Sequence, residues 1–287
     1  MNDIFNSSMP IGIYESEKDR FKIEFDRISF CVSRNGGRII SLKYGAQELL
    51  TQPNEHEMHG STFWHDPQSS WNWPPPPVLD NMPYDGGIIE RSIHLISAFD
   101  NDNGLQFEKI FSVNDDRSIK ICYHIKNISI VPKSVGPWEI TRVPSGGVSF
   151  FVQGENAVLP ASDLNNITTE KGIVWYQPDN VQFPGGKKYF STVGEGWLAH
   201  VSKNILFVKK FRHIDAKQIA PGQGELEIYA HGDKSYIELE NHGEHQNLLP
   251  GKSLVYNVQW YLKDLPLDTD HYLQKEKLVD EVRFLIK

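Results

Sequence analysis

The chain has 287 residues, of which 39% are hydrophobic and 23% charged, a composition that is ordinary for a globular protein with a sizeable core. Its formal net charge of -8 at pH 7 argues against a partner that needs a basic face, so neither a nucleic acid nor an anionic membrane is predicted. No stretch approaches the roughly 20 apolar residues of a membrane helix. Residues 1–6 lack the basic and apolar regions of a signal peptide, so the sequence as given predicts a cytoplasmic location by default.

Short segments in which apolar and polar residues alternate dominate the chain. They are rich in Ile, Val, Phe and Tyr, as strands are, and turn residues such as Asn35-Gly36-Gly37 separate them. In chain order, the predicted strands include 21–25, 88–96, 106–113, 118–125, 197–201, 205–211, 226–229, 236–240 and 253–262. Many such strands in one uninterrupted chain predict an all-β fold of two packed antiparallel sheets, as one domain over residues 1–287.

The last segment is the exception to this pattern. Over residues 267–287, Leu278, Val282 and Leu285 form an apolar stripe at helical spacing, which predicts a short C-terminal helix. The two cysteines, Cys31 and Cys122, lie in alternating apolar runs and are interpreted as buried free thiols that act as small hydrophobic residues.

The most unusual segment, residues 60–77, is called the Trp/Pro segment below. It contains three of the seven tryptophans and ends in four prolines. Its aromatic and polar side chains suit a sugar, which offers an apolar C–H face and a rim of hydroxyls; they are Trp64, Trp71, Trp73, His65 and Gln68. Two alternatives remain open: the segment packs its own tryptophans onto the end of a sandwich without a ligand, or it is a proline-rich ligand for a partner.

Ionisable residues interrupt several strand patterns. Glu238 and Glu240 share one strand face, while Glu139 and Arg142 lie on opposite faces of residues 135–143, and Lys209 lies within the strand 205–211. Two carboxylates that are two residues apart on one face can couple, and one then titrates at high pH, as a general acid or base requires. The alternative is a row of solvent-facing charges. The recurrence of such residues in separate strands favours one concave sheet face.

No cofactor or metal ion is predicted. His56, His59 and His65 lie close in sequence and have acidic neighbours, but their spacing fits no standard metal site. Phosphate-binding loops, nucleophile elbows and zinc-protease motifs are likewise absent from the sequence.

Three stretches resemble the galactose mutarotase-like (aldose 1-epimerase-like) superfamily, in a poorly characterised branch. Asn35-Gly36-Gly37 to Glu48-Leu49-Leu50 is similar to the family's opening hairpin. Residues 93–129, which end in Asn127-Ile128-Ser129, are similar to the region before a site strand. Residues 236–262, with Leu249-Pro250-Gly251 at their centre, are similar to the acid-bearing strand and the closing strand. The resemblance implies a β-supersandwich and a small or oligomeric carbohydrate as the ligand.

Family epimerases open and reclose a sugar ring with a glutamate as base and a histidine as acid. The resemblance places the base at Glu238, with Glu240 as the rival. The strand on which the family carries its histidine reads Trp138-Glu139-Ile140-Thr141-Arg142 here and has no imidazole. Glu139, His242 or His65 would then have to supply the proton.

Three hypotheses follow: an aldose 1-epimerase-type isomerase, a carbohydrate-binding domain without catalysis on the same groove, and a lyase or hydrolase accessory domain acting on a uronate, whose carboxylate Arg38, Arg142 and Lys209 would bind. The predicted catalytic residues are Glu238, Glu240 and Glu139. The predicted substrate-binding residues are Trp64, His65, Gln68, Trp71, Trp73, Arg142, Lys209, His242 and Arg38. The oligomeric state is left open.

Overall fold

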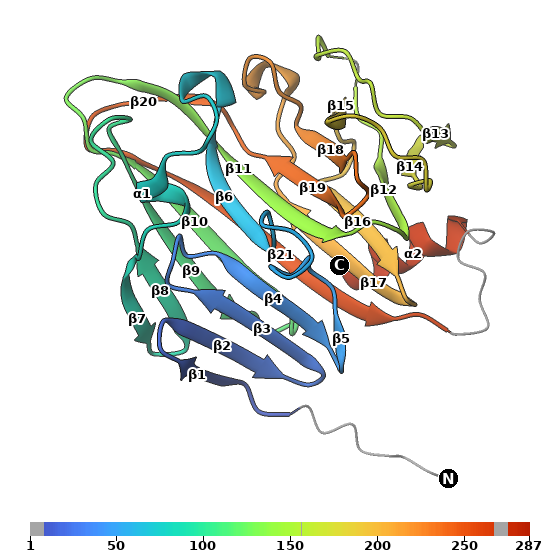
Figure 1. Ribbon diagram of the computed structural model, residues 1–287, viewed down its shortest axis with the longest axis horizontal. Coiled ribbons are helices and arrows are strands. Elements are labelled where there is room, and N and C mark those ends of the chain that lie inside the picture. Colours follow the sequence, from blue (N-terminus) through green and yellow to red (C-terminus); the bar gives the residue numbers. More distant parts are fainter. Residues whose placement is uncertain (1–8, 156, 267–274) are drawn as a thin grey trace.

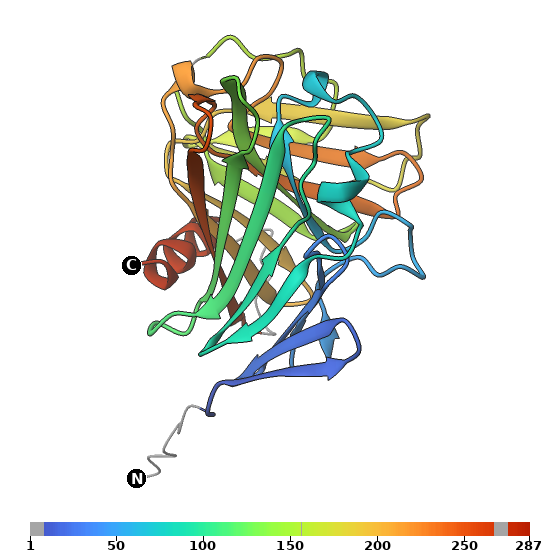
Figure 2. The ribbon, with the colours of Figure 1, turned by 90° about the vertical axis from the view of Figure 1, so that its left-hand side faces the viewer.

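Two antiparallel sheets that pack face to face use most of the alternating segments (Figures 1 and 2). The computed structural model describes residues 9–155, 157–266 and 275–287. The sheets have 11 and 10 strands, which confirms the predicted β-supersandwich.

The first sheet carries most of the residues that matter below. Its strands in spatial order are β1 (Gly12–Glu17), β2 (Arg20–Phe25), β3 (Ile28–Ser33), β4 (Ile39–Tyr44), β6 (Ser61–Asp66), β11 (Lys133–Pro144), β19 (Tyr236–His242), β18 (Leu226–His231) and β15 (Gly186–Ser191). Two short strands extend it: β5 (Gln47–Glu48) pairs with β4, and β20 (Gln246–Leu248) pairs with β11.

The second sheet lies behind the first in Figure 1. Its strands in spatial order are β13 (Ile167–Glu170), β14 (Ile173–Tyr176), β12 (Val148–Val152), β16 (Trp197–Ser202), β17 (Ile205–Phe211), β21 (Ser253–Asp264), β10 (Ile119–Asn127), β9 (Leu105–Val113), β8 (Ser92–Ile96) and β7 (Asp85–Ile89).

The main hydrophobic core fills the space between the sheets. Phe63 of β6 stacks on Tyr123 of β10, with ring centroids 4.0 Å apart. Burial of such large apolar side chains contributes on the order of 25 cal/mol per Å² of area removed from water, which holds the two layers together.

Helices are few and short in the part of the chain that the structure describes: α1 (Pro77–Asp80), α2 (Lys275–Leu285) and the 3₁₀ turns η1 (Gln68–Ser70) and η2 (Ala216–Gln218). Helix α2 packs on the outer side of the second sheet (Figure 2), where Lys210 of β17 donates a hydrogen bond to the carbonyl of Ile286 (2.6 Å). Leu278 and Val282 of the predicted stripe are buried. The first part of the predicted helix, residues 267–274, lies outside the described residues. None of these helices is long and apolar enough to cross a membrane.

One strand prediction is wrong. Residues 88–96 form the hairpin of β7 and β8 rather than one strand. Glu90 at the turn adopts a positive φ of 53°, and no glycine, asparagine or aspartate marks that position in the sequence. Cys31 and Cys122 are both free thiols as predicted, although Cys122 is only half-buried.

Candidate functional site

The candidate site lies on the face of the first sheet that points away from the second, called the outer face below. Strand β11 shows which side this is. The hydroxyl of Tyr123 in β10 donates to the Glu139 carboxylate (2.8 Å), and Lys209 of β17 pairs with the same carboxylate (3.0 Å), so Glu139 points between the sheets. Because side chains alternate along a strand, Trp138 and Arg142 point to the outer face.

Register then places residues from the neighbouring strands on the same face. Within the pair of β11 and β19, Trp138 lies opposite His242, Ile140 opposite Glu240 and Arg142 opposite Glu238. The pair of β19 and β18 adds two more residues opposite these acids, Glu227 and Tyr229. The pair of β11 and β6 adds Trp64 and Thr62.

Aromatic rings cover the part of the outer face over β6 and β11. Trp64 and Trp138 contact each other (5.2 Å between centroids) and are buried, and Trp71 packs against both. Trp73 contacts Trp64 at 6.0 Å but is 58% exposed. The Trp/Pro segment therefore folds back onto the sheet. It packs part of its own aromatic surface there and leaves the ring of Trp73 open to solvent.

An aspartate anchors this aromatic cluster. Asp80, in α1, accepts hydrogen bonds from the indole N–H of Trp64 (2.7 Å) and from the guanidinium of Arg38 (3.1 Å). Arg38 also donates to the carbonyl of His59 (3.3 Å). Through these two contacts, Arg38 links α1 to the loop before β6.

The predicted base Glu238 forms an ion pair with Arg142, at 2.8 Å from its Nε. Arg142 is fully buried, donates to Thr62 (3.2 Å) and lies 5.5 Å from the Trp64 ring. No hydrogen-bond partner is found for its Nη2 among the described residues. Glu238 is 9% exposed, which makes it the one predicted catalytic acid that reaches solvent.

Beside this pair lies a buried charge network centred on Lys188 of β15. Its ammonium lies 2.6 Å from Glu227 and 3.0 Å from Glu240, and both carboxylates are fully buried. Glu240 also accepts from the indole N–H of Trp138 (2.8 Å), whose ring lies 5.2 Å from the ammonium. Burial, opposed by Lys188, raises the pKa of Glu240 to about 7.

A buried histidine joins the same network. His242 lies between Asp66, 3.3 Å from Nδ1, and Glu227, 3.3 Å from Nε2. Burial alone would lower its pKa, but these two carboxylates outweigh burial and raise the pKa of His242 to about 9. Asp66 also pairs with His245 at 2.7 Å.

Glu227, Glu240 and His242 lie close enough together to suggest a metal site. The ammonium of Lys188, however, already supplies the positive charge between the two glutamates. These residues therefore form a structural ion network, in which each buried charge has an opposite partner.

The structure does not bring all the predicted site residues together. Glu139 and Lys209 pair with each other between the sheets, away from the outer face. His65 is buried, and burial lowers its pKa to about 4. Gln68 lies in η1, where its backbone N–H donates to Gln223 (3.0 Å). The structure places the remaining predicted residues on the outer face: Glu238, Glu240, Arg142, His242, Trp64, Trp71, Trp73 and Arg38.

Sequence reasoning missed Glu227, Tyr229 and Lys188, which lie beside Glu238 and Glu240. Glu227 and Tyr229 alternate with apolar residues in β18, the signal that singled out Glu238 and Glu240 one strand later. Lys188 had no such signal, because residues 186–191 carry no apolar alternation.

Comparison of whole folds finds several solved structures that are similar to this chain over most of its length. A putative aldose 1-epimerase from Escherichia coli K12 superposes with a TM-score of 0.57 at 11% identity, over 89% of this chain and 100% of that one. A galactose mutarotase-like protein from Clostridium acetobutylicum gives 0.58 at 11%, over 91% and 100%. A TPR-domain containing protein from Parabacteroides distasonis gives 0.60 at 13%, over 87% and 48%. At these identities the likeness shows the fold, which is the one that the sequence resemblance implied.

Comparison by sequence finds one family and no curated relative. No curated protein matches the chain significantly. The model of a family described as a domain of unknown function, DUF4380, matches residues 68–263, which is more than half of the chain and includes the Trp/Pro segment from Gln68 onward and β19. The chain therefore belongs to the DUF4380 family.

Proposed function

We propose that this protein binds a carbohydrate on the outer face of the first sheet and isomerises it in the manner of an aldose 1-epimerase, with Glu238 as the base. One observation carries the proposal. Glu238 reaches solvent on a face lined with tryptophans, whereas Glu240 and Glu139 are fully buried. Arg142, which pairs with Glu238, lies 5.5 Å from the Trp64 ring, and Trp64 contacts the exposed ring of Trp73 at 6.0 Å. A carboxylate and an aromatic ring on one face match the hydroxyl rim and the apolar C–H face of a pyranose.

The surroundings of Glu238 support this role. Arg142 holds the carboxylate in one position, 2.8 Å from its Nε. Tyr229 lies directly opposite on β18, and burial together with the charge of Glu238 raises its pKa, so its phenol stays protonated as a hydrogen-bond donor. Trp73 offers an exposed ring against which a sugar can pack.

The proposed reaction uses Glu238 as the base and Tyr229 as the acid, and ring closure restores the protonation state of both. Glu238 takes the proton from the anomeric hydroxyl, the bond from the anomeric carbon to the ring oxygen breaks, and the Tyr229 phenol gives that oxygen its proton. The open-chain aldehyde rotates, and the reverse steps close the ring on the other face.

A second candidate is a carbohydrate-binding domain without catalysis. A specific observation favours it: His242 and His65, the imidazoles proposed as proton donors, are both buried and out of reach of a bound sugar. Glu238 and Arg142 would then act only as hydrogen-bonding partners of the sugar hydroxyls.

The decisive experiment is NMR exchange spectroscopy on a panel of aldoses and uronic acids, with wild type, Glu238→Gln and the control Glu108→Gln. Glu108 lies on β9 of the second sheet, far from the outer face in the fold. Isomerisation predicts faster anomer exchange that Glu238→Gln abolishes and Glu108→Gln retains. Line broadening without faster exchange, weakened by Trp73→Ala, would support the binding domain. Neither signal with any sugar would refute both candidates.

A further inference from the structure

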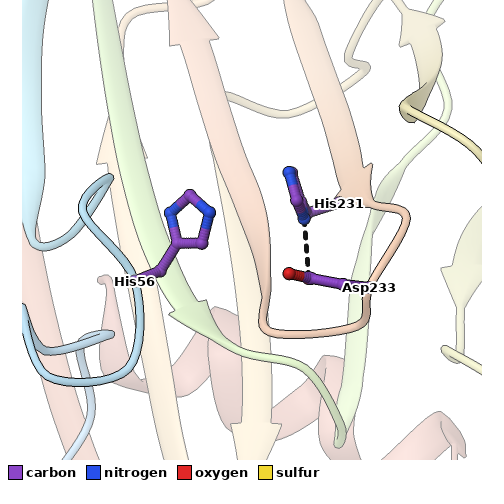
Figure 3. Close-up of side chains that lie close together, drawn as sticks. All are labelled: His56, His231 and Asp233. Carbon is purple, nitrogen blue, oxygen red and sulfur yellow. Dashed lines mark hydrogen bonds and ion pairs between the residues drawn. The ribbon is translucent and has the colours of Figure 1, made fainter.

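A cluster of three potential metal ligands lies at the rim of the first sheet, separate from the network around Lys188. His56 comes from the loop between β5 and β6, His231 ends β18, and Asp233 lies in the turn to β19 (Figure 3). One potential ligand atom from each residue lies within 4.8 Å of the others. Two segments that are far apart in the sequence thus meet at one point on the surface.

The two imidazoles rest on a common support. The ring of Tyr236 stacks on His231 (5.0 Å, 23°) and also contacts His56 (4.8 Å), while the rings of the two histidines are 4.9 Å apart. Because Tyr236 is buried in β19, it holds both histidines beside each other.

His231 also contacts a carboxylate, as zinc-binding histidines typically do through the ring nitrogen that does not bind the metal. Asp233 accepts from His231 Nδ1 at 2.6 Å, which leaves Nε2 as the free ligand atom. Hydrogen bonds from the backbone N–H (2.8 Å) and hydroxyl (2.6 Å) of Ser235 orient the carboxylate of Asp233. Figure 3 shows Asp233 directly beside His231, with His56 facing both.

The charge around the cluster differs from that of the buried network. No ion pair between Asp233 and a lysine or arginine is found among the described residues, whereas Lys188 lies between Glu227 and Glu240. The rim cluster is also accessible, since the side chains of His231 and Asp233 are 27% and 52% exposed. A cation can therefore reach the rim cluster, where no lysine or arginine of the described residues pairs with the Asp233 carboxylate.

We propose that His56, His231 and Asp233 form a binding site for a divalent transition metal ion of the zinc type. The Nε2 atoms of the two imidazoles would bind the ion directly, Asp233 would orient His231 from Nδ1, and the remaining positions would be open to water or a ligand. The spacing of histidines in the sequence did not predict this site, because its members lie in separate segments. The inference does not depend on the proposed carbohydrate function, since metal binding is measured without a sugar.

The ring of His56 provides a specific test. The backbone N–H of Met58 donates to His56 Nδ1 (3.0 Å), so in the neutral ring the proton lies on Nε2, which faces His231. Zinc coordination through Nε2 moves that proton to Nδ1 and displaces the bond from Met58. The amide resonance of Met58 is therefore expected to shift when zinc binds.

The experiment is equilibrium dialysis of the tag-free chain against zinc chloride, with metal analysis, for wild type, His56→Ala, His231→Ala and Asp233→Asn. His59→Ala is the matched control, because His59 lies in the same loop and outside the cluster. We expect about one zinc ion per chain, about 10- to 100-fold weaker binding in Asp233→Asn, and a larger loss in the two alanine variants. His59→Ala should bind zinc as the wild type does.

A readout on the wild type keeps the test independent of variant folding. Nitrogen NMR of the imidazoles, with and without zinc, should show shifts at His56 and His231 but none at His94 on β8. Binding of zinc that leaves these two rings unchanged, equal binding by all variants, or no binding by wild type would each overturn the proposal.

Discussion

Removing the ammonium of Lys188 tests whether the buried charge network stabilises the fold. In Lys188→Met, the carboxylates of Glu227 and Glu240 lose a cation at 2.6 and 3.0 Å, and both are fully buried. Removing one partner of a buried ion pair typically costs about 3–5 kcal/mol, because the remaining charge is uncompensated. Since the Lys188 side chain is 21% exposed, water offsets part of this, and we expect a loss of about 3 kcal/mol in the free energy of unfolding.

The assay is equilibrium urea unfolding followed by circular dichroism. The variants are compared on condition that the dependence of the unfolding free energy on urea concentration has the same slope in all of them. Lys187→Met is the matched control, because the ammonium of Lys187 lies over the ring of Phe183 (5.1 Å). This variant should lose less than about 1 kcal/mol of unfolding free energy. The double variant Lys188→Met/Glu240→Gln should recover part of the loss, since it removes one of the two uncompensated charges. A loss below about 1 kcal/mol in Lys188→Met would refute the assignment of this network as stabilising.

The pH dependence of the Lys188→Met loss has a defined sign. The pKa of Glu240 is already raised to about 7 in the folded state, against the 4.5 of an unperturbed glutamate, and losing the cation raises it further. As pH rises above 4.5, the unfolded chain releases the Glu240 proton, whereas the folded variant keeps it up to a pH above 7. The loss in Lys188→Met should be smaller at pH 5 than at pH 8, and an equal loss at both would contradict this reasoning.

Three further predictions can be checked by urea unfolding. His242→Gln should cost more at pH 6 than at pH 9.5, because the stabilisation from a pKa raised to about 9 is complete below pH 6.5 and is lost as pH rises through 9; a constant cost would count against it. Gly36→Ala, whose Cβ would lie 1.8 Å from the Asp80 carbonyl oxygen at φ 67°, should destabilise far more than Gly251→Ala, which has the strained φ of 71° but open space, and similar losses would contradict the packing argument. Trp64→Ala should lose about 3–5 kcal/mol and Trp73→Ala less than about 1, because Trp64 is buried while Trp73 is 58% exposed; the reverse order would exclude the described packing of the Trp/Pro segment.

The sequence by itself determined the architecture. Period-two alternation and turn residues predicted most of the strands, their packing into two sheets and the terminal helix, because these signals are local in the chain. The pair Glu238 and Glu240 and the tryptophans of the Trp/Pro segment were also visible as local patterns. All of them lie on one sheet face in the structure.

Tertiary structure alone decided which face of each strand is inside. Alternation shows that Glu139 and Arg142 lie on opposite faces of β11, but it does not say which face meets the second sheet. The contact with Lys209 decided this, and it separates Glu139 from the outer face. The approach of His56 to His231 and Asp233 was equally beyond the sequence. Such contacts depend on the order of strands in the sheets and on the packing of one sheet against the other, and no pattern of neighbouring residues encodes them.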